Sequence, residues 1–162
     1  MAWNYLRLDM RPEKLKALTQ FWIDAGEGYG LGSKIDDLPS FKDPDHKVDC
    51  SGFVRWLIWH AVADTGNSVD KYTASTFPDG SWKQETWVKQ KQFKKSGFDA
   101  GLLRDGAVRI AFKDGRIRHV VLIANGMTFE SHGGKGPAMR RWGSKPWMKR
   151  CTVYVLTPPE GM

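Results

Sequence analysis

The chain of 162 residues contains 41% hydrophobic and 27% charged residues, which suits one globular domain over residues 1–162 with a real core. Its net charge of +7 favours anionic partners, but no nucleic-acid-binding motif accompanies that charge, so we expect no nucleic-acid partner. No apolar run is long enough for a membrane span, and the first residues lack the pattern of a secretory signal. We therefore expect synthesis in the cytoplasm and another delivery route to any extracellular target.

Helical periodicity dominates the first part of the chain. Apolar residues at helical spacing predict three helices, over residues 11–25, 50–65 and 81–94. A Gly-rich segment and a polar stretch over 33–49 predict loops before the second helix. A polar connection over about 67–80 is expected before the third helix, whose apolar face would include Trp82 and Trp87.

Strand patterns follow the helices. Residues 107–112, 118–124, 127–132 and 151–156 are rich in β-branched and aromatic residues. Asn125 and Gly126 separate two of these runs, and this dipeptide favours a tight hairpin because both turn positions need positive φ. Helices followed by a small antiparallel sheet predict an α+β fold.

Cys50 is the candidate nucleophile. It lies in the polar sequence VDCSGFV, directly before the apolar run of the second helix. The first turn of a helix offers unpaired N–H groups and a positive dipole end, which favour a thiolate and can stabilise an oxyanion. Asp49 and Ser51 indicate an accessible site. Cys151 instead opens an alternating apolar run and is predicted to be a packed strand residue.

A cysteine nucleophile needs a base, and the chain has four histidines. His46 lies in a predicted loop, and His60 lies about 15 Å along the helix from Cys50. The other two, His119 and His132, lie on the predicted hairpin. With Asn125 and Gly126 as the turn, His119 faces His132, and Glu130 projects from the same face diagonally to His119. Either Glu130 or His132 could then orient His119.

The DCSGFV segment, the apolar helix after it and the later strand RHVVLIANG together resemble the NlpC/P60 family of peptidoglycan-cleaving cysteine peptidases. The resemblance covers about residues 26–157 and extends to related amidases of phage lysins and secretion-system effectors. It implies a papain-like α+β fold with N-terminal helices packed on a small antiparallel sheet. It also implies Cys50 as nucleophile, His119 as base and Glu130 as the third catalytic residue, with His132 as the alternative.

The same resemblance suggests substrate-binding residues. Tyr29 corresponds to a tyrosine that borders the active site, although Leu31, Gly32 and Ser33 replace the family's tryptophan-glycine-glycine. Ser51, which directly follows the candidate nucleophile, is a second candidate for substrate binding. From its position in a Gly-rich loop over 130–137, Lys135 could meet a substrate carboxylate.

These features predict a hydrolase of peptidoglycan stem peptides that works through an acyl-enzyme and needs no metal or organic cofactor. The bond implied by the resemblance joins a γ-D-glutamyl group to a diamino acid. The enzyme would act at the bacterial cell wall after lysis or delivery by a phage or secretion system, and a delivered toxin would have an immunity protein as partner. Two alternatives remain open: an acyltransferase or non-wall amidase with the same Cys/His pair, and a non-catalytic basic wall-binding module.

Overall fold

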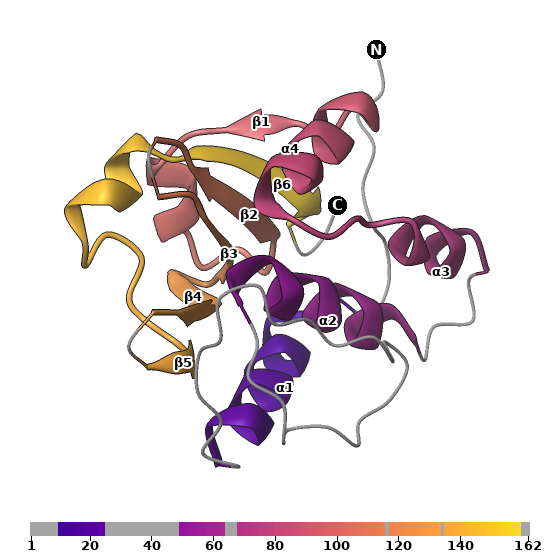
Figure 1. Ribbon diagram of the computed structural model, residues 1–162, viewed down its shortest axis with the longest axis horizontal. Coiled ribbons are helices and arrows are strands. Elements are labelled where there is room, and N and C mark those ends of the chain that lie inside the picture. The colour runs from indigo at the N-terminus through magenta and orange to yellow at the C-terminus, as the bar shows by residue number, and fades with distance from the viewer. Residues whose placement is uncertain (1–9, 25–48, 64–67, 116, 134, 160–162) are drawn as a thin grey trace.

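The computed structural model describes residues 10–24, 49–63, 68–115, 117–133 and 135–159. These residues form helices first and then mainly strands, which confirms the predicted α+β plan (Figure 1). The α-helices are α1 (Pro12–Asp24), α2 (Cys50–Ala63), α3 (Ser68–Ser75) and α4 (Ser81–Gln90). The strands are β1 (Lys95–Ser96), β2 (Val108–Lys113), β3 (His119–Ala124), β4 (Met127–His132), β5 (Gly136–Ala138) and β6 (Thr152–Thr157). Two short 3₁₀ helices are η1 (Asp99–Leu102) and η2 (Pro146–Arg150).

The strands form one six-stranded antiparallel sheet in the order β1-β6-β2-β3-β4-β5. The last strand in the chain, β6, therefore lies inside the sheet, between β1 and β2. Apolar side chains from β2, β3 and β6 alternate between the two faces of the sheet, so each face carries its own cluster of buried apolar residues.

The helices cover one face of this sheet, and the segment around η2 covers part of the other. On the helical face, Val120 and Leu122 of β3 belong to the same buried cluster as Trp22 of α1 and Phe53 of α2. On the opposite face, a smaller cluster forms around Trp142, with Met148 of η2 among its members. The helix α2 is buried on nearly all sides, which explains why its apolar residues are not confined to one stripe.

The hairpin between β3 and β4 has the predicted turn. Asn125 and Gly126 have φ values of 50° and 78°, as a tight hairpin turn requires. Ala124 pairs with Met127 and Leu122 with Phe129, which confirms the predicted register over this part of the hairpin. The described pairing between the two strands stops there and does not extend to the expected pair of His119 with His132.

Several local predictions are wrong. The connection over 67–80 contains helix α3, and the Gly-rich loop after β4 contains strand β5. Trp82 is 61% exposed rather than packed, because the face of α4 that meets the core instead carries Trp87 and Val88. None of the helices in the described ranges is long and apolar enough to cross a membrane.

Candidate active site

Asp49 fixes the start of helix α2. Its carboxylate accepts the Gly52 N–H at 2.8 Å and the Ser51 hydroxyl at 3.3 Å, and its carbonyl accepts the Phe53 N–H at 3.0 Å. This is the N-cap arrangement, in which a side-chain oxygen satisfies an N–H group of the first turn. The cap makes Cys50 the first residue of the helix.

A second contact ties the start of α2 to helix α4. Gln84 is fully buried, and its side-chain amide donates to the Ser51 carbonyl at 2.9 Å and to the Pro78 carbonyl at 3.0 Å. No sequence motif marks Gln84, because its role depends on how two helices meet. The residue before this contact, Cys50, is held at a fixed place in the fold.

Replacing Asp49 by alanine should lower the free energy of unfolding by about 1 kcal/mol, because the first turn of α2 loses its cap. Urea unfolding monitored by tryptophan fluorescence measures the change. Asp49→Asn is the matched control, since asparagine caps helices as well as aspartate does. An equal loss in both variants would show that the charge of Asp49, rather than the cap, stabilises the fold.

The thiol of Cys50 meets His119, which lies far from it in the sequence. The side chain of Cys50 hydrogen-bonds the imidazole of His119, at the first residue of strand β3. Cys50 is 8% exposed and packs at the edge of the main core, so it is less accessible than its polar neighbours suggest. The burial follows from the position of α2 between α1 and the sheet. The candidate nucleophile and the candidate base are thus brought together from two layers of the fold.

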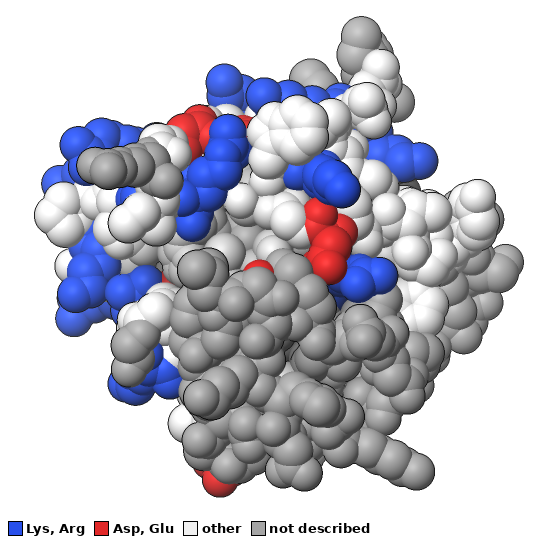
Figure 2. Space-filling view, viewed as in Figure 1, with Lys and Arg blue, Asp and Glu red and all other residues white. Residues whose placement is uncertain are grey.

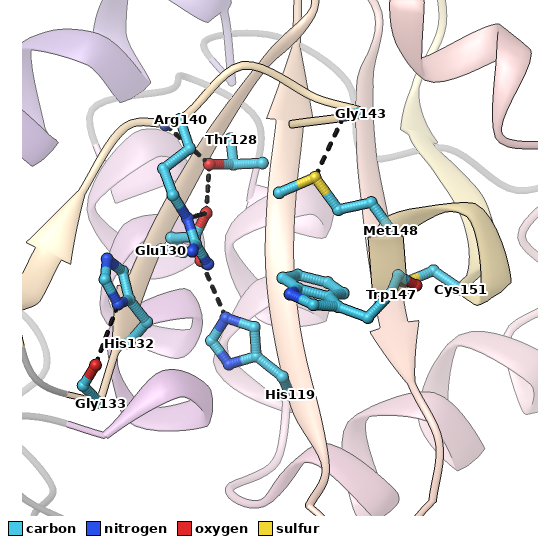
Figure 3. Close-up of polar contacts among 10 residues, drawn as sticks. All are labelled: His119, Thr128, Glu130, His132, Gly133, Arg140, Gly143, Trp147, Met148 and Cys151. Carbon is cyan, nitrogen blue, oxygen red and sulfur yellow. Dashed lines mark hydrogen bonds and ion pairs between the residues drawn. The ribbon is translucent and has the colours of Figure 1, made fainter. Parts of the chain in front are cut away.

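Glu130 occupies the other side of the imidazole. The Nε2 atom of His119 lies 2.9 Å from a carboxylate oxygen of Glu130, in strand β4 (Figure 3). Because this contact uses Nε2, Nδ1 is the ring nitrogen left to serve Cys50. A carboxylate in this position holds one tautomer and stabilises the imidazolium.

Glu130 is fully buried, and two further side chains hold it. Arg140 donates to both carboxylate oxygens, with Nε 3.1 Å from Oε2 and an Nη2 contact to Oε1, and Thr128 donates its hydroxyl to Oε2. The Thr128 hydroxyl in turn accepts the backbone N–H of Arg140 at 2.9 Å. Such a two-point guanidinium contact fixes the plane of the carboxylate. No motif in the sequence marks Arg140, which is the first residue of the basic segment over 140–150.

These contacts move the pKa values of the two ionisable partners in opposite directions. Burial disfavours the imidazolium of His119, but hydrogen bonds and negative charge from Cys50 and Glu130 outweigh it and raise the His119 pKa to about 8. Burial likewise disfavours the carboxylate of Glu130, but hydrogen bonds from His119, Arg140 and Thr128 lower its pKa to about 2. At neutral pH the site therefore favours a protonated His119 beside an ionised Glu130.

Trp147 lies beside the imidazole of His119. Its ring centroid is 5.3 Å from that of His119, at an interplanar angle of 84°, and the Arg140 guanidinium lies 5.7 Å from the same ring (Figure 3). Trp147 comes from η2, on the far side of the sheet from the helices. It limits the positions that the imidazole can adopt and shields one edge of the ring from solvent.

The remaining candidate residues lie in different environments. The ring of His132 points to the Gly133 carbonyl, 3.1 Å from its Nδ1 atom, and burial followed by the charge of Arg140 lowers its pKa. Lys135 is exposed in the turn between β4 and β5. Ser51 is buried, with its hydroxyl on Asp49. Tyr29 and His46 lie outside the described residues. The geometry thus favours Glu130 over His132 as the partner of His119.

Cys151 differs from Cys50 in its surroundings. It is partly buried near the opposite cluster, its thiol lies 3.6 Å from the Trp147 carbonyl, and burial raises its pKa to about 12. A thiol in this state is a poor nucleophile. The described part of the chain contains no group of three or more His, Cys, Asp or Glu side chains placed to hold a metal ion.

No model of a known protein family matches the chain, and no curated protein matches it either. The side-chain geometry of the site and the resemblance of its sequence motifs are therefore the grounds for a functional proposal.

Proposed function

We propose that the chain is a cysteine peptidase of the NlpC/P60 type, with a papain-like fold, that hydrolyses an amide bond in peptidoglycan stem peptides. The arrangement of Cys50, His119 and Glu130 carries this proposal. A thiol at the first residue of a helix, a histidine in contact with it and a buried carboxylate behind the histidine are the parts that acyl transfer through a thiolate needs.

In the first step the Cys50 sulfur attacks the amide carbonyl carbon, and its proton resides on Nδ1 of His119. The carbonyl oxygen becomes an oxyanion, for which the N–H of Cys50, at the start of the helix, is a suitable donor. The carbon–nitrogen bond then breaks as His119 delivers its proton to the leaving amine. A thioester between Cys50 and the acyl part of the substrate remains.

In the second step water attacks the thioester, and His119 takes a proton from it. The carbon–sulfur bond breaks, the acyl group leaves as a carboxylate and the thiol–imidazole pair is restored. Glu130 keeps its negative charge throughout, because Arg140 and Thr128 stabilise the ionised form. Its role is to orient His119 and to stabilise the imidazolium.

The choice of substrate rests on the sequence motifs and on the charge of the chain. The DCSGFV motif and the hairpin after RHVVLIANG resemble the wall-cleaving family, and the net charge of +7 suits an anionic polymer. A bond between a γ-D-glutamyl group and a diamino acid is the favoured target. A delivered toxin of this kind would act at the bacterial wall and would have an immunity protein in the cell that makes it.

Digestion of purified peptidoglycan tests the proposal. The wild type should release new peptide termini, identified by mass spectrometry, and Cys50→Ala should release none above background. Cys151→Ala is the matched control and should retain activity, since its partly buried thiol takes no part in the reaction.

Two other results would overturn the proposal. Intact peptidoglycan together with a Cys50 thiol that reacts rapidly with iodoacetamide would point to an acyltransferase or an amidase of another substrate. Equal digestion by the wild type and Cys50→Ala would exclude a thiol mechanism altogether.

A further inference from the structure

A pocket of about 310 Å³ lies against strands β1, β6 and β2, away from His119. Arg109, which lines this pocket, precedes Lys113 by four residues along β2, and Lys113 is the partner of His119 in the sheet. At roughly 3.3 Å per residue, Arg109 lies about 13 Å along the strand from the level of His119. The pocket is therefore separate from the candidate active site. Its volume is at the small end of the range for ligand pockets, so it suits a small ligand or one end of a larger one.

The strand register places a cation on each side of an apolar residue in this pocket. Arg109 pairs with Val155 across β2 and β6, and the Val155 N–H donates to the Lys94 carbonyl at 2.8 Å, directly before β1. Residues that face each other across paired strands project from the same face of a sheet. With neighbouring strands about 4.8 Å apart, Lys94 and Arg109 leave the sheet roughly 10 Å from each other, with Val155 between them. Val155 is buried but belongs to neither apolar cluster, which suits a residue on the floor of a pocket.

Arg109 is a buried cation with unused hydrogen-bond donors. Its side chain is only 6% exposed, and Asp105 accepts one hydrogen bond from each of its terminal nitrogens, at 3.2 and 2.9 Å. A guanidinium has five N–H donors, so these two bonds leave three. The Nε atom is buried and has no hydrogen-bond partner among the described residues. Because a buried donor without a partner is unfavourable, an acceptor oxygen in the pocket would stabilise Arg109.

Further donors come from β1, at the edge of the sheet. Lys94 is exposed, and in the described part of the chain its side chain has no ion pair. The Ser96 hydroxyl makes only a long hydrogen bond of 3.5 Å, to the Gly97 carbonyl. Figure 2 shows Lys and Arg side chains along the edge of the molecule where Figure 1 places β1. The described lining of the pocket contains three basic residues and no carboxylate, so an anion there meets donors from β1 on one side and from β2 on the other.

We infer that Lys94, Ser96 and Arg109 bind the phosphate group of a small phosphate ester. The organic part of this ester lies on the apolar floor, which Val155, Ala100 and Pro159 form. A phosphate carries about −1.5 to −2 charges at pH 7 and three acceptor oxygens, so it can meet donors on opposite sides of the pocket at once. A carboxylate has a single charge and two oxygens in one plane, and it spans these donors less well. The site adds a binding activity that does not depend on the proposed hydrolysis.

Titration of the isotope-labelled protein with propyl phosphate, followed by amide NMR spectroscopy at pH 7, tests the site. The backbone signals of Ser96, Gly97 and Val155 should shift with one shared Kd. The Nε–H signal of Arg109 should shift with them, because the phosphate supplies a partner for this buried donor. Propanol, which lacks the phosphate, should leave these signals unchanged. Inorganic phosphate, which lacks the propyl group, should bind more weakly.

Lys94→Gln should raise the Kd for propyl phosphate about tenfold, the effect expected for a hydrogen bond between charged groups. Lys94 is exposed, so the substitution should leave the fold intact. Lys95→Gln is the matched control. This neighbouring lysine is also exposed and borders the pocket, but it pairs with Tyr154 of the main core, so its side chain leaves the sheet on the helical face. The loss of affinity in Lys95→Gln should be much smaller.

A third variant should act in the opposite direction. Asp105→Asn removes the negative charge that balances Arg109, so it should lower the Kd for propyl phosphate.

Three results would overturn the site or part of it. Propyl phosphate that shifts none of the named signals would exclude a phosphate site in this pocket. Equal losses of affinity in Lys94→Gln and Lys95→Gln would also overturn it, since the general charge of this edge would then be the cause. Equal affinities for inorganic phosphate and propyl phosphate would overturn the choice of an ester, because the apolar floor would then make no contact with the ligand.

Discussion

Replacing His119 by glutamine should lower kcat/KM for stem-peptide hydrolysis by about 10⁴-fold, because one residue serves both as base for Cys50 and as acid for the leaving amine. Glutamine keeps a hydrogen-bonding group of similar size beside Glu130 but cannot exchange a proton. Steady-state kinetics on a synthetic stem peptide give the ratio of the two kcat/KM values. Alkylation of the Cys50 thiol by iodoacetamide at pH 6 should slow in the same variant, since no imidazolium then lies beside the sulfur.

His132→Gln is the matched control for this change. His132 lies in the same hairpin and lines a pocket of about 440 Å³ together with His119, but its described hydrogen bond is to the Gly133 carbonyl. We expect a loss of less than about tenfold in kcat/KM, as for the removal of one uncharged contact. A loss as large as that of His119→Gln would make His132 the third catalytic residue in place of Glu130.

Replacing Glu130 by alanine should lower the free energy of unfolding by about 3–5 kcal/mol, because it leaves the guanidinium of Arg140, only 20% exposed, without its partner. Urea unfolding at pH 7 measures this. The double variant Glu130→Leu with Arg140→Met should recover much of the loss, since it removes both charges together. If the losses measured for Glu130→Leu and for Arg140→Met alone add up to the loss in the double variant, the pair is not coupled.

The pH dependence of the free energy of unfolding is an independent test of how the Glu130 carboxylate stabilises the fold. The pKa of Glu130 is about 2 in the folded chain, against an ordinary value of 4.5, so its stabilising effect is complete above about pH 4.5 and is lost as the pH falls toward 2. The unfolding free energies of the wild type and Glu130→Gln should therefore converge in acid. The raised pKa of His119 has the opposite pH dependence. Its contribution to the free energy of unfolding is complete below pH 6.5 and is lost as the pH rises through about 8.

The sequence predicted well those parts of the molecule that depend on local patterns. The turn at Asn125 and Gly126 follows from the φ values that these two residues tolerate, and the register near the turn follows from the turn itself. The start of α2 at Cys50 follows from the polar-to-apolar change after Asp49. These features involve residues close together in the chain, so short-range chemistry determines them.

The parts that escaped prediction depend on distant contacts. Arg140 reaches Glu130 because β5 pairs with β4 and returns the chain beside it, and the Gly-rich sequence of this segment gave no strand signal. Trp147 meets His119 only through the docking of η2 on the sheet. The resemblance already favoured Glu130 over His132, and the 2.9 Å contact between Glu130 and His119 supports that choice, but the end of the β3–β4 pairing before His119 and His132 was not foreseen.

The place of β6 inside the sheet has a consequence for the cell that makes the protein. Residues 152–157 leave the ribosome after the other described strands, yet they lie between β1 and β2 and carry Tyr154 and Leu156 of the main core. Until they emerge, the sheet that presents His119 to Cys50 lacks an internal strand. We therefore expect the nascent chain to lack the proposed hydrolytic activity until β6 has emerged and folded into the sheet.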